Sequence, residues 1–376
     1  MRLLGQPARV FEYDKLNRMK KRTDVDGVTD WVYDVASANS LGIGRLSSET
    51  IVHTSPADTF SKTYTYDPAE NGRLTKVVTS IHGTTYEESM TYNANGQLLT
   101  QNYPSSPGGG FSVSHTYNAR GYLERVQCPG GANVYYLTVA TNAQGRITQE
   151  WLGDGTDVTT NFEGTSARVE SQLSLNTATV QSFSYDYDAS GNMEKREDTL
   201  HGLEETFTYD NLDRLKSAQV TGGPLINYDF DESGNITQKD DVADIYDYLM
   251  GPTHAVTMLT QGSTSRVLSY ADNGNFLLGT NEPDVTWSSY NKPTQLTKGS
   301  ISYEFKYGTD RRRYKKTRGS VTTHYVGSRF EKTLGSSPKY RSVVYANGRA
   351  VMVRKYEGGM NKNQYLHRDH LGSVTA

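Results

Sequence analysis

The stretch Tyr92-Asn93-Ala94-Asn95-Gly96-Gln97-Leu98 recurs with small changes along the whole chain. Close copies are Tyr117-Asn118-Ala119-Arg120-Gly121-Tyr122-Leu123 and Tyr187-Asp188-Ala189-Ser190-Gly191-Asn192-Met193, and Gly234 and Gly274 occupy the glycine position of two more copies. The steps from Tyr92 to Tyr117 and from Tyr187 to Tyr209 are 25 and 22 residues. Self-similarity with this period predicts about a dozen structural units, each made of two strands.

Each position of the repeat has a physical reason. The aromatic residue ends a strand and packs on a sheet face, and the following Asp or Asn accepts a backbone hydrogen bond in an Asx turn. The glycine position requires a positive φ, which Asn and Asp tolerate best after glycine. This explains why Asn17 and Asp213 stand there in two variants. The apolar residue two places later begins the next strand.

The runs between these turns alternate polar and apolar residues, as in Ser182-Phe183-Ser184-Tyr185-Asp186-Tyr187. This period of two is typical of β-strands, and no segment shows a helical stripe with caps. Because single hairpins are marginal in water, the copies must pair edge to edge. We therefore predict an all-β protein whose antiparallel hairpins form a curled or spiral sheet. A propeller is the alternative, but its repeat would be about 40 to 45 residues.

The composition narrows the functional class. Tyrosine contributes 27 of the 376 residues and glycine 35, as expected for thin sheets with many tight turns. The formal net charge of -3 does not indicate nucleic acid as a partner. With Cys128 as the single cysteine, no intrachain disulfide is expected, and no apolar run is long enough to predict a membrane span or signal peptide. No cofactor and no metal are predicted.

The repeat pattern changes towards the C-terminus. We expect a hairpin-repeat array over residues 1–300, with a flexible loop near 103–110, and a different module over 301–376 with longer aliphatic strands. A last turn of the repeat type is expected at Tyr345-Ala346-Asn347-Gly348-Arg349.

Together these motifs resemble the YD repeats of the Rhs family. The segment Tyr365-Leu366-His367-Arg368-Asp369-His370-Leu371-Gly372-Ser373 is similar to the Tyr-x-x-x-Asp-x-Leu-Gly-Ser sequence of the Rhs repeat-associated core. Tyr365, Asp369, Leu371, Gly372 and Ser373 carry this resemblance. It implies a hollow β shell of a secreted or cell-surface bacterial toxin, exported by a signal outside this chain. The core would be truncated at Ala376, and the enclosed toxic domain would lie beyond it.

The resemblance also implies partners and a reaction. A partner similar to a Tc B component or to a secretion system is expected besides the toxic domain itself. Many cores of this kind cut their own chain through paired aspartates, which makes Asp369, with Arg368 beside it, the candidate catalytic residue. The second carboxylate would lie beyond the chain, so no enzyme activity is expected here.

Other functions were weighed on the residues. For Asp369, a turn carboxylate that caps backbone amides is favoured over an acid or base role. A metal site from His367, Asp369 and His370 is not favoured, because His367 and His370 would face opposite sides of a strand. Carbohydrate binding through exposed rings such as Trp151 or Trp287, in a cell-surface YD-repeat protein, remains the alternative to a toxin shell.

Overall fold

The computed structural model describes residues 9–36, 40–54, 57–164, 166–249 and 251–375. These residues form two compact units, Met1–Tyr135 with Thr286–Gln364 (unit 1) and Tyr136–Val285 with Tyr365–Ala376 (unit 2). The described residues contain strands and one short 3₁₀ helix, so the predicted all-β class is confirmed. Among them no helix has the length and apolar character that a membrane crossing requires.

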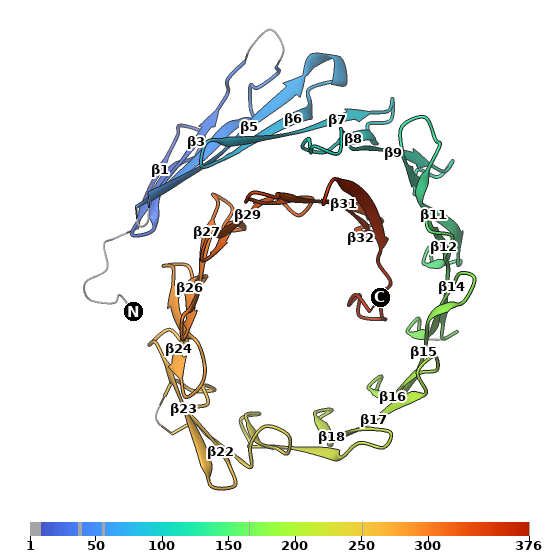
Figure 1. The fold of residues 1–376 in the computed structure, drawn as a ribbon, viewed down its shortest axis with the longest axis vertical. Coiled ribbons are helices and arrows are strands. Elements are labelled where there is room, and N and C mark those ends of the chain that lie inside the picture. The colour runs from blue at the N-terminus through green and yellow to red at the C-terminus, as the bar shows by residue number, and fades with distance from the viewer. Residues whose placement is uncertain (1–8, 37–39, 55–56, 165, 250, 376) are drawn as a thin grey trace. The chain divides into compact units, whose positions relative to one another are not determined.

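The first sheet of unit 1 is made of consecutive antiparallel strands (Figure 1). They are β1 (Val10–Tyr13), β2 (Met19–Asp24), β3 (Gly27–Tyr33), β4 (Leu46–Thr54), β5 (Ala57–Asp67), β6 (Arg73–Ile81), β7 (Thr84–Tyr92), β8 (Leu98–Asn102), β9 (Ser112–Tyr117) and β10 (Leu123–Gln127), with η1 (Pro68–Glu70) before β6. A second sheet of nine strands follows much later in the chain. It comprises β25 (Asp284–Trp287), β26 (Pro293–Lys298), β27 (Ile301–Tyr307), β28 (Arg313–Arg318), β29 (Val321–Val326), β30 (Phe330–Thr333), β31 (Lys339–Ala346), β32 (Arg349–Glu357) and β33 (Met360–Tyr365).

The two sheets of unit 1 pack face to face, and Figure 1 shows them as a blue layer against an orange to red one. The rings of Phe60 and Tyr314 stack with centroids 4.6 Å apart. The buried residues of this core are Ile51, Phe60, Ile81, Tyr86, Tyr314, Val326, Phe330 and Tyr340. Unit 1 therefore has a hydrophobic core between two layers, as most stable β structures do.

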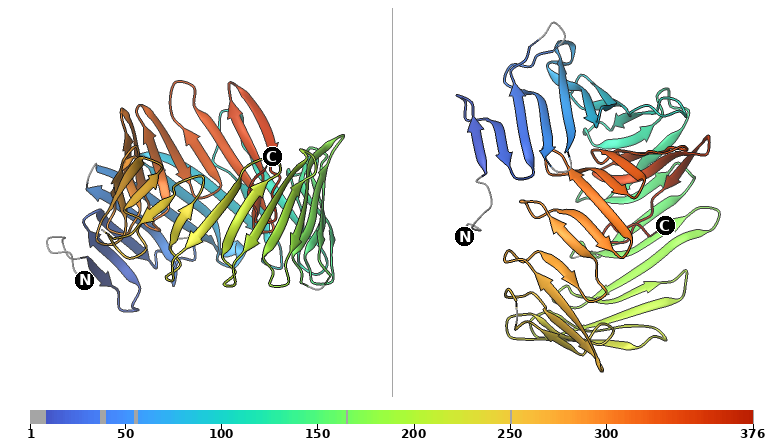
Figure 2. Two further views of the ribbon diagram at one scale, coloured as in Figure 1. Left: turned by 90° about the horizontal axis from the view of Figure 1, so that it is seen from below. Right: turned by 60° about the vertical axis from the view of Figure 1, so that its left-hand side comes forward.

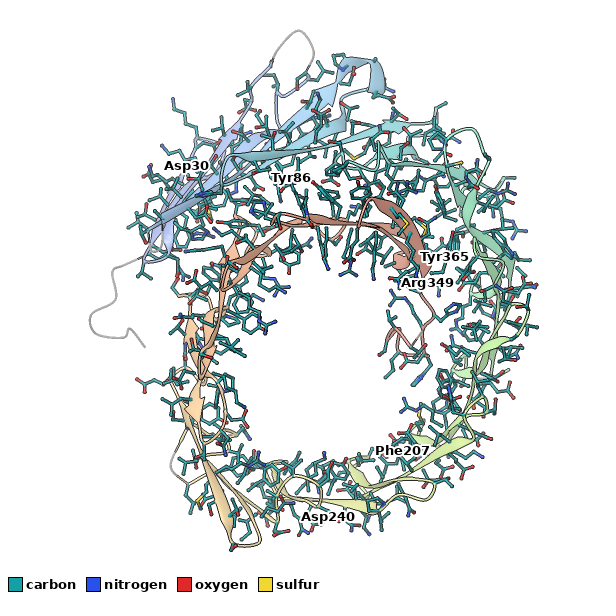
Figure 3. The ribbon with its side chains drawn as sticks, viewed as in Figure 1. Asp30, Tyr86, Phe207, Asp240, Arg349 and Tyr365 are labelled. Atoms are coloured by element: carbon teal, nitrogen blue, oxygen red, sulfur yellow. The ribbon has the colours of Figure 1, made fainter. Side chains whose placement is uncertain are left out.

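Unit 2 is itself a series of antiparallel hairpins, as the views of Figure 2 show. Its strands are β11 (Val134–Thr141), β12 (Ile147–Leu152), β13 (Asp157–Phe162), β14 (Val169–Leu175), β15 (Thr179–Tyr187), β16 (Met193–Asp198), β17 (Leu203–Tyr209), β18 (Leu215–Val220), β19 (Leu225–Phe230), β20 (Ile236–Lys239), β21 (Ile245–Asp247), β22 (Met258–Gln261), β23 (Thr264–Tyr270) and β24 (Phe276–Gly279). From β16 through β20 no residue is buried. Figure 3 shows side chains on both sides of this layer, near Phe207 and Asp240. This part of unit 2 is a single sheet that is accessible on both faces.

The repeat turn has the local geometry that its residues predict. The N–H of Asn93 donates to the carbonyl of Gln97 and the N–H of Gly96 donates to the carbonyl of Asn93, both at 2.9 Å. The Oδ1 of Asn93 accepts from the N–H groups of Asn95 and Gln97, both at 3.0 Å. Gly96 has a φ of +80°. The Asx turn and the positive φ are therefore confirmed.

The same conformation holds in the other copies. The glycines at this position have φ values between +78° and +98°, and the non-glycine residues Asn17 and Asp213 have φ values of +60° and +58° there. The glycines are Gly121, Gly145, Gly191, Gly234 and Gly274. The residue that ends the first strand pairs with the apolar one across a bulge, as Tyr209 does with Leu215; it is aromatic in most copies and Thr141 in the copy with Gly145. A bulge at a fixed place strengthens the local twist of every hairpin.

Neighbouring units are joined by the tyrosine hydroxyl, a contact that the sequence reasoning did not anticipate. The Tyr92 hydroxyl donates to the carbonyl of Leu74 at 2.7 Å, and the Tyr209 hydroxyl donates to the carbonyl of Met193 at 2.8 Å. Other hydroxyls with the same role are those of Tyr33, Tyr66, Tyr117, Tyr187 and Tyr248. Each donates to the carbonyl of the apolar residue that follows the preceding turn. This explains why the repeat uses Tyr far more often than Phe.

An arginine in the repeat adds a second link between units. The Arg73 guanidinium lies 5.7 Å from the centroid of the Tyr92 ring, and Arg168 lies 4.9 Å from that of Tyr187. Each arginine precedes the apolar residue of one unit and covers the aromatic ring of the next. Such cation–π contacts are worth about 0.5–1 kcal/mol at exposed sites. The tyrosine hydroxyl and the arginine together form a ladder that runs from hairpin to hairpin.

Three further copies of the turn have a residue other than glycine at the position of positive φ. Phe162 pairs with Val169 across a turn in which Ala167 has a φ of +68°. In the second, the N–H of Ser288 donates to the carbonyl of Lys292 at 2.8 Å, and Asn291 has a φ of +60°. In the third, the N–H of Gly308 donates to the carbonyl of Arg312 at 2.9 Å, and Arg311 has a φ of +60°.

One expected copy has a different turn. Asn347 and Gly348 both have a positive φ, +49° and +81°, and Ala346 pairs directly with Arg349. These are the features of a two-residue type I′ hairpin. The prediction of a repeat-type turn at 345–349 is therefore wrong, because Ala346 has no side-chain oxygen that could form the Asx turn.

The loop near 103–110 is anchored at both ends. Tyr103 and Phe111 are buried, and the N–H of Tyr103 donates to the carbonyl of Phe111 at 2.9 Å. The Tyr103 hydroxyl donates to the carbonyl of Val343 at 3.0 Å, and the Asn361 side chain donates to the carbonyl of Gly108 at 3.0 Å. These contacts attach the loop to the second sheet of unit 1.

Candidate functional site

The C-terminal motif folds into the same turn as the repeats. The N–H of Asp369 donates to the carbonyl of Ser373, and the N–H of Gly372 donates to the carbonyl of Asp369, both at 3.0 Å. The Oδ1 of Asp369 accepts from the N–H of Leu371 at 3.0 Å and from that of Ser373 at 2.8 Å. Gly372 has a φ of +86°. Atom for atom, this is the hydrogen bonding of the turn at Asn93.

The alignment of the motif on the repeat places Arg368 where the aromatic residue stands elsewhere. Arg368 forms an isolated bridge with Val374, which takes the place of the apolar residue. The Arg368 guanidinium donates to the carbonyl of Gly372 within the turn. The core motif is thus a modified repeat turn in which a cation replaces the ring.

This turn docks on β15 within unit 2. The Gln181 side chain donates to the carbonyl of Arg368 at 2.8 Å, and its Oε1 accepts from the Thr375 hydroxyl. The His370 ring lies against the Tyr185 ring, with centroids 4.3 Å apart. Burial lowers the pKa of His370. Tyr365 lies before the turn at the end of β33, and Leu371 is 78% exposed at the tip of the turn.

In this chain the Asp369 carboxylate caps backbone N–H groups of its own turn. One carboxylate oxygen is occupied by two backbone N–H groups. Within the residues that the structure describes, no group of three or more His, Cys, Asp or Glu side chains is arranged to hold a metal ion. His367 is buried, and burial lowers its pKa as well.

A second cluster of charged residues lies between the sheets of unit 1, and sequence reasoning missed it. The Asp58 side chain, only 1% exposed, forms an ion pair with Lys315 and lies 3.1 Å from the Nδ1 of His82. Burial by itself raises the pKa of Asp58, but the contacts with Lys315 and His82 hold it below its usual value. Asp58 and Lys315 are 257 residues apart, and no local signal in the sequence links them.

The same interface buries a neutral histidine. The Nδ1 of His324 lies 2.8 Å from the Tyr86 hydroxyl. Burial, followed by the charge of Lys315, lowers the pKa of His324 to about 4. These polar contacts favour one alignment of the two sheets, because any other alignment would leave a buried polar group without its partner.

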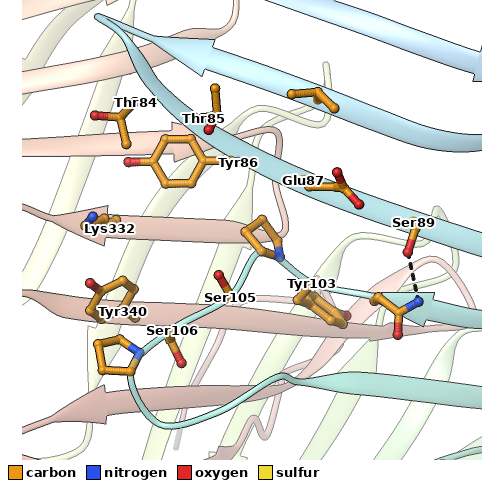
Figure 4. Close-up of a pocket in the computed structure, with 14 residues that line it drawn as sticks. Thr84, Thr85, Tyr86, Glu87, Ser89, Tyr103, Ser105, Ser106, Lys332 and Tyr340 are labelled. Atoms are coloured by element: carbon orange, nitrogen blue, oxygen red, sulfur yellow. Dashed lines mark hydrogen bonds between the residues drawn. The ribbon is translucent and has the colours of Figure 1, made fainter.

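A polar cavity of about 800 Å³ opens beside this interface (Figure 4). It is lined by Tyr86 of the first sheet, by Lys332 and Tyr340 of the second, and by the loop with Ser105 and Ser106. Its wall has no nucleophile and base placed within hydrogen-bond reach of each other. We therefore assign no chemistry to it.

The two tryptophans expected to bind sugars have different surroundings. Trp151 is half-buried within β12. Trp287, at the end of β25, lines a hollow of about 350 Å³ together with Asp26, Tyr290 and Phe305.

These features define the class of the molecule: it is an all-β protein of the YD hairpin-repeat type, built from interlocked units. Among solved structures it is similar to the Photorhabdus luminescens Tc holotoxin pore, with a TM-score of 0.65 and 15% identity over 99% of this chain and 23% of that one. The crystal structure of TcdB2-TccC3 gives a TM-score of 0.65 and 15% identity over 97% of this chain and 23% of that one. A crystal structure of TcdB2-TccC3 without the hypervariable C-terminal region gives a TM-score of 0.64, 15% identity and the same coverage.

At this identity the likeness concerns the fold. The chain has the Rhs/YD-type repeat fold of these Tc toxin components, as its motifs predicted, and it spans about a quarter of the length of the solved chains it matches. Comparisons with protein-family profiles and with curated proteins give no match.

Proposed function

We propose that this chain is a wall segment of an Rhs-type toxin shell, which encloses and delivers a toxic domain of the same polypeptide. The observation that carries the proposal is the fold shared with TcdB2-TccC3 over 97% of the chain. In this proposal residues 1–300 are the repeat array and residues 301–376 begin the Rhs core. The protein acts outside the bacterial cell and meets a partner similar to a Tc B component or to a secretion system.

The physical design of the repeats supports such a role. A wall needs a thin sheet that tolerates water on both sides, and β16 through β20 contain no buried residue. A thin sheet has little core, so its stability depends on links between neighbouring units. The ladder of tyrosine hydroxyls and arginines supplies such links.

Electron cryomicroscopy of the full-length protein tests the proposal. We expect a closed wall around a separate density for the toxic domain. Small-angle scattering of the 376-residue chain gives an independent measure, because a compact globule of this length has a radius of gyration of about 21 Å. A value near that figure, or a full-length particle without an internal space, would refute a shell.

Self-cleavage at the core is a further part of the proposal, with Asp369 as the acid or base and Arg368 as its neighbour. Asp188 provides a matched control, because its Oδ1 accepts from the N–H of Gly191 and of Asn192 in an equivalent turn. In the full-length protein we expect D369N to abolish cleavage and D188N to leave it unchanged. Both asparagines preserve the Asx turn, so equal cleavage in the two variants would leave Asp369 a purely structural role.

The alternative is carbohydrate binding by a cell-surface protein of the same fold. The specific observation in its favour is the hollow at Trp287, since an aromatic ring beside a carboxylate is suited to a sugar. A glycan array tests it. Binding that is lost in W287A but retained in W151A would replace the shell proposal, and an array without binders would exclude this alternative.

A further inference from the structure

The charge of the chain is strongly segregated. Residues 284–365, which form the second sheet of unit 1, contain 17 of the 39 Lys and Arg residues but 5 of the 42 Asp and Glu residues. This sheet therefore has a formal charge of 17 - 5 = +12, and the rest of the chain has 22 - 37 = -15. The overall value of -3 conceals a basic sheet in an otherwise acidic protein.

The cross-strand register shows which face carries these charges. Residues that pair directly share a face, and neighbours along a strand face opposite sides. His324, Lys332 and Tyr340 form one row, and the buried His324 and Tyr340 place it on the core side. The rows on either side of it along the strands therefore face away from the core. They are Lys316, Thr323, Thr333 and Lys339, and Tyr325, Glu331, Arg341 and Lys355.

This outer face is hollowed rather than flat. A depression of about 520 Å³ is lined by five cations and two carboxylates. The cations are Arg313, Lys316, Lys339, Arg341 and Lys355, and the carboxylates are Glu331 and Glu357. The side chains of Lys339 and Arg341 are 56% and 46% exposed. We call these seven residues the basic hollow.

We propose that the basic hollow is a docking surface for an acidic polypeptide segment. Two of its cations already hold carboxylates: Arg341 lies 3.2 Å from Glu331, and Lys339 is paired with Glu357. Of the other three, Arg313, Lys316 and Lys355, none forms an ion pair with a carboxylate in the described part of the chain. Like charges gathered in a hollow attract a ligand of opposite charge and raise its rate of association.

The surroundings favour a polypeptide over a nucleic acid. Single-stranded nucleic acid binds on open aromatic faces, but the Arg313 guanidinium covers the Tyr325 ring at 4.6 Å. Glu331 and Glu357 would also repel a phosphate chain, whereas an acidic peptide can place its own carboxylates between them. The hollow extends over β28 to β32, about 19 Å at the usual strand spacing, which about six extended residues span.

The test measures the binding of a fluorescent peptide of about 12 glutamates to the 376-residue chain by anisotropy, with a glutamine peptide of equal length as reference. We expect binding of the glutamate peptide alone, weakened when NaCl rises from about 50 to about 200 mM. The variant K316E/K355E should bind at least about tenfold more weakly, a change of about 1.4 kcal/mol.

The variant K20E/K76E is the matched control. It makes the same change of charge on the first sheet of the same unit, where both lysines are paired with glutamates. It should bind within about twofold of the parent. Three results would overturn the proposal. The two variants could lose affinity equally, the glutamate peptide could fail to bind, or a thymidine oligonucleotide of the same length could bind more tightly than the glutamate peptide. The proposal does not depend on the shell, because it concerns the chain alone.

Discussion

Replacing Asp58 with alanine should destabilise unit 1, because it leaves the charge of Lys315 without its partner between two sheets. The Asp58 side chain is 1% exposed, and its Oδ1 accepts from the N–H of Thr59 at 2.8 Å. Loss of one partner of a buried ion pair costs about 3–5 kcal/mol. The Lys315 side chain is 20% exposed, so water can solvate part of its charge. We therefore expect a loss of about 3 kcal/mol.

Urea unfolding followed by tryptophan fluorescence measures this loss. Unit 1 contains Trp31 and Trp287 and unit 2 contains Trp151, so the variants are made in a W151F background that reports on unit 1. If the free energy of unfolding of a variant depends less steeply on urea concentration than that of the parent, unit 1 no longer unfolds in one step.

The control is E87A in the same unit, which removes an exposed carboxylate 3.3 Å from Lys76, and its cost should stay below about 0.5 kcal/mol. The double variant D58A/K315M should be more stable than D58A, because methionine removes the unpaired charge. If D58A costs no more than E87A, or if adding K315M to D58A gives no recovery, the ion pair does not hold the sheets together.

Three further predictions concern stability. As pH falls from about 6.5 to about 4, His324 takes up a proton in the unfolded state but not in the folded state, where it is buried. The free energy of unfolding, at its full value above pH 6.5, should therefore decrease by about 3 kcal/mol, which urea midpoints measured across this pH range should show. H324Q should reduce this dependence of stability on pH. Y209F removes the hydrogen bond to the carbonyl of Met193 and should lower the free energy of unfolding in urea by about 1 kcal/mol. An unchanged free energy of unfolding would show that the tyrosine hydroxyl does not stabilise the link between units. G234A places a Cβ at a φ of +83° and should cost about 1 kcal/mol, so a raised melting temperature would contradict the turn assignment.

For the core motif, the residue types predict the local turn but not its tertiary contacts. The order Asp369, Gly372 and Ser373 predicts an Asx turn, and the structure has that turn. Residue types could not show that Gln181 and Tyr185 hold the turn on β15, since those contacts join residues about 190 positions apart. Catalysis by Asp369 is a proposal, because the same residues at the same spacing are expected whether the carboxylate only caps the turn or also acts as an acid or base.

The sequence by itself determined the class of fold and the conformation of nearly every turn. Those properties depend on φ preferences, Asx bonding and a period of two, all of which act within a few residues. The tertiary structure alone decided that Tyr hydroxyls and arginines connect successive hairpins and that Asp58 meets Lys315. It also decided that the cations of the second sheet gather in one hollow. Such contacts depend on strand register and on the packing of distant segments, which local preferences do not encode.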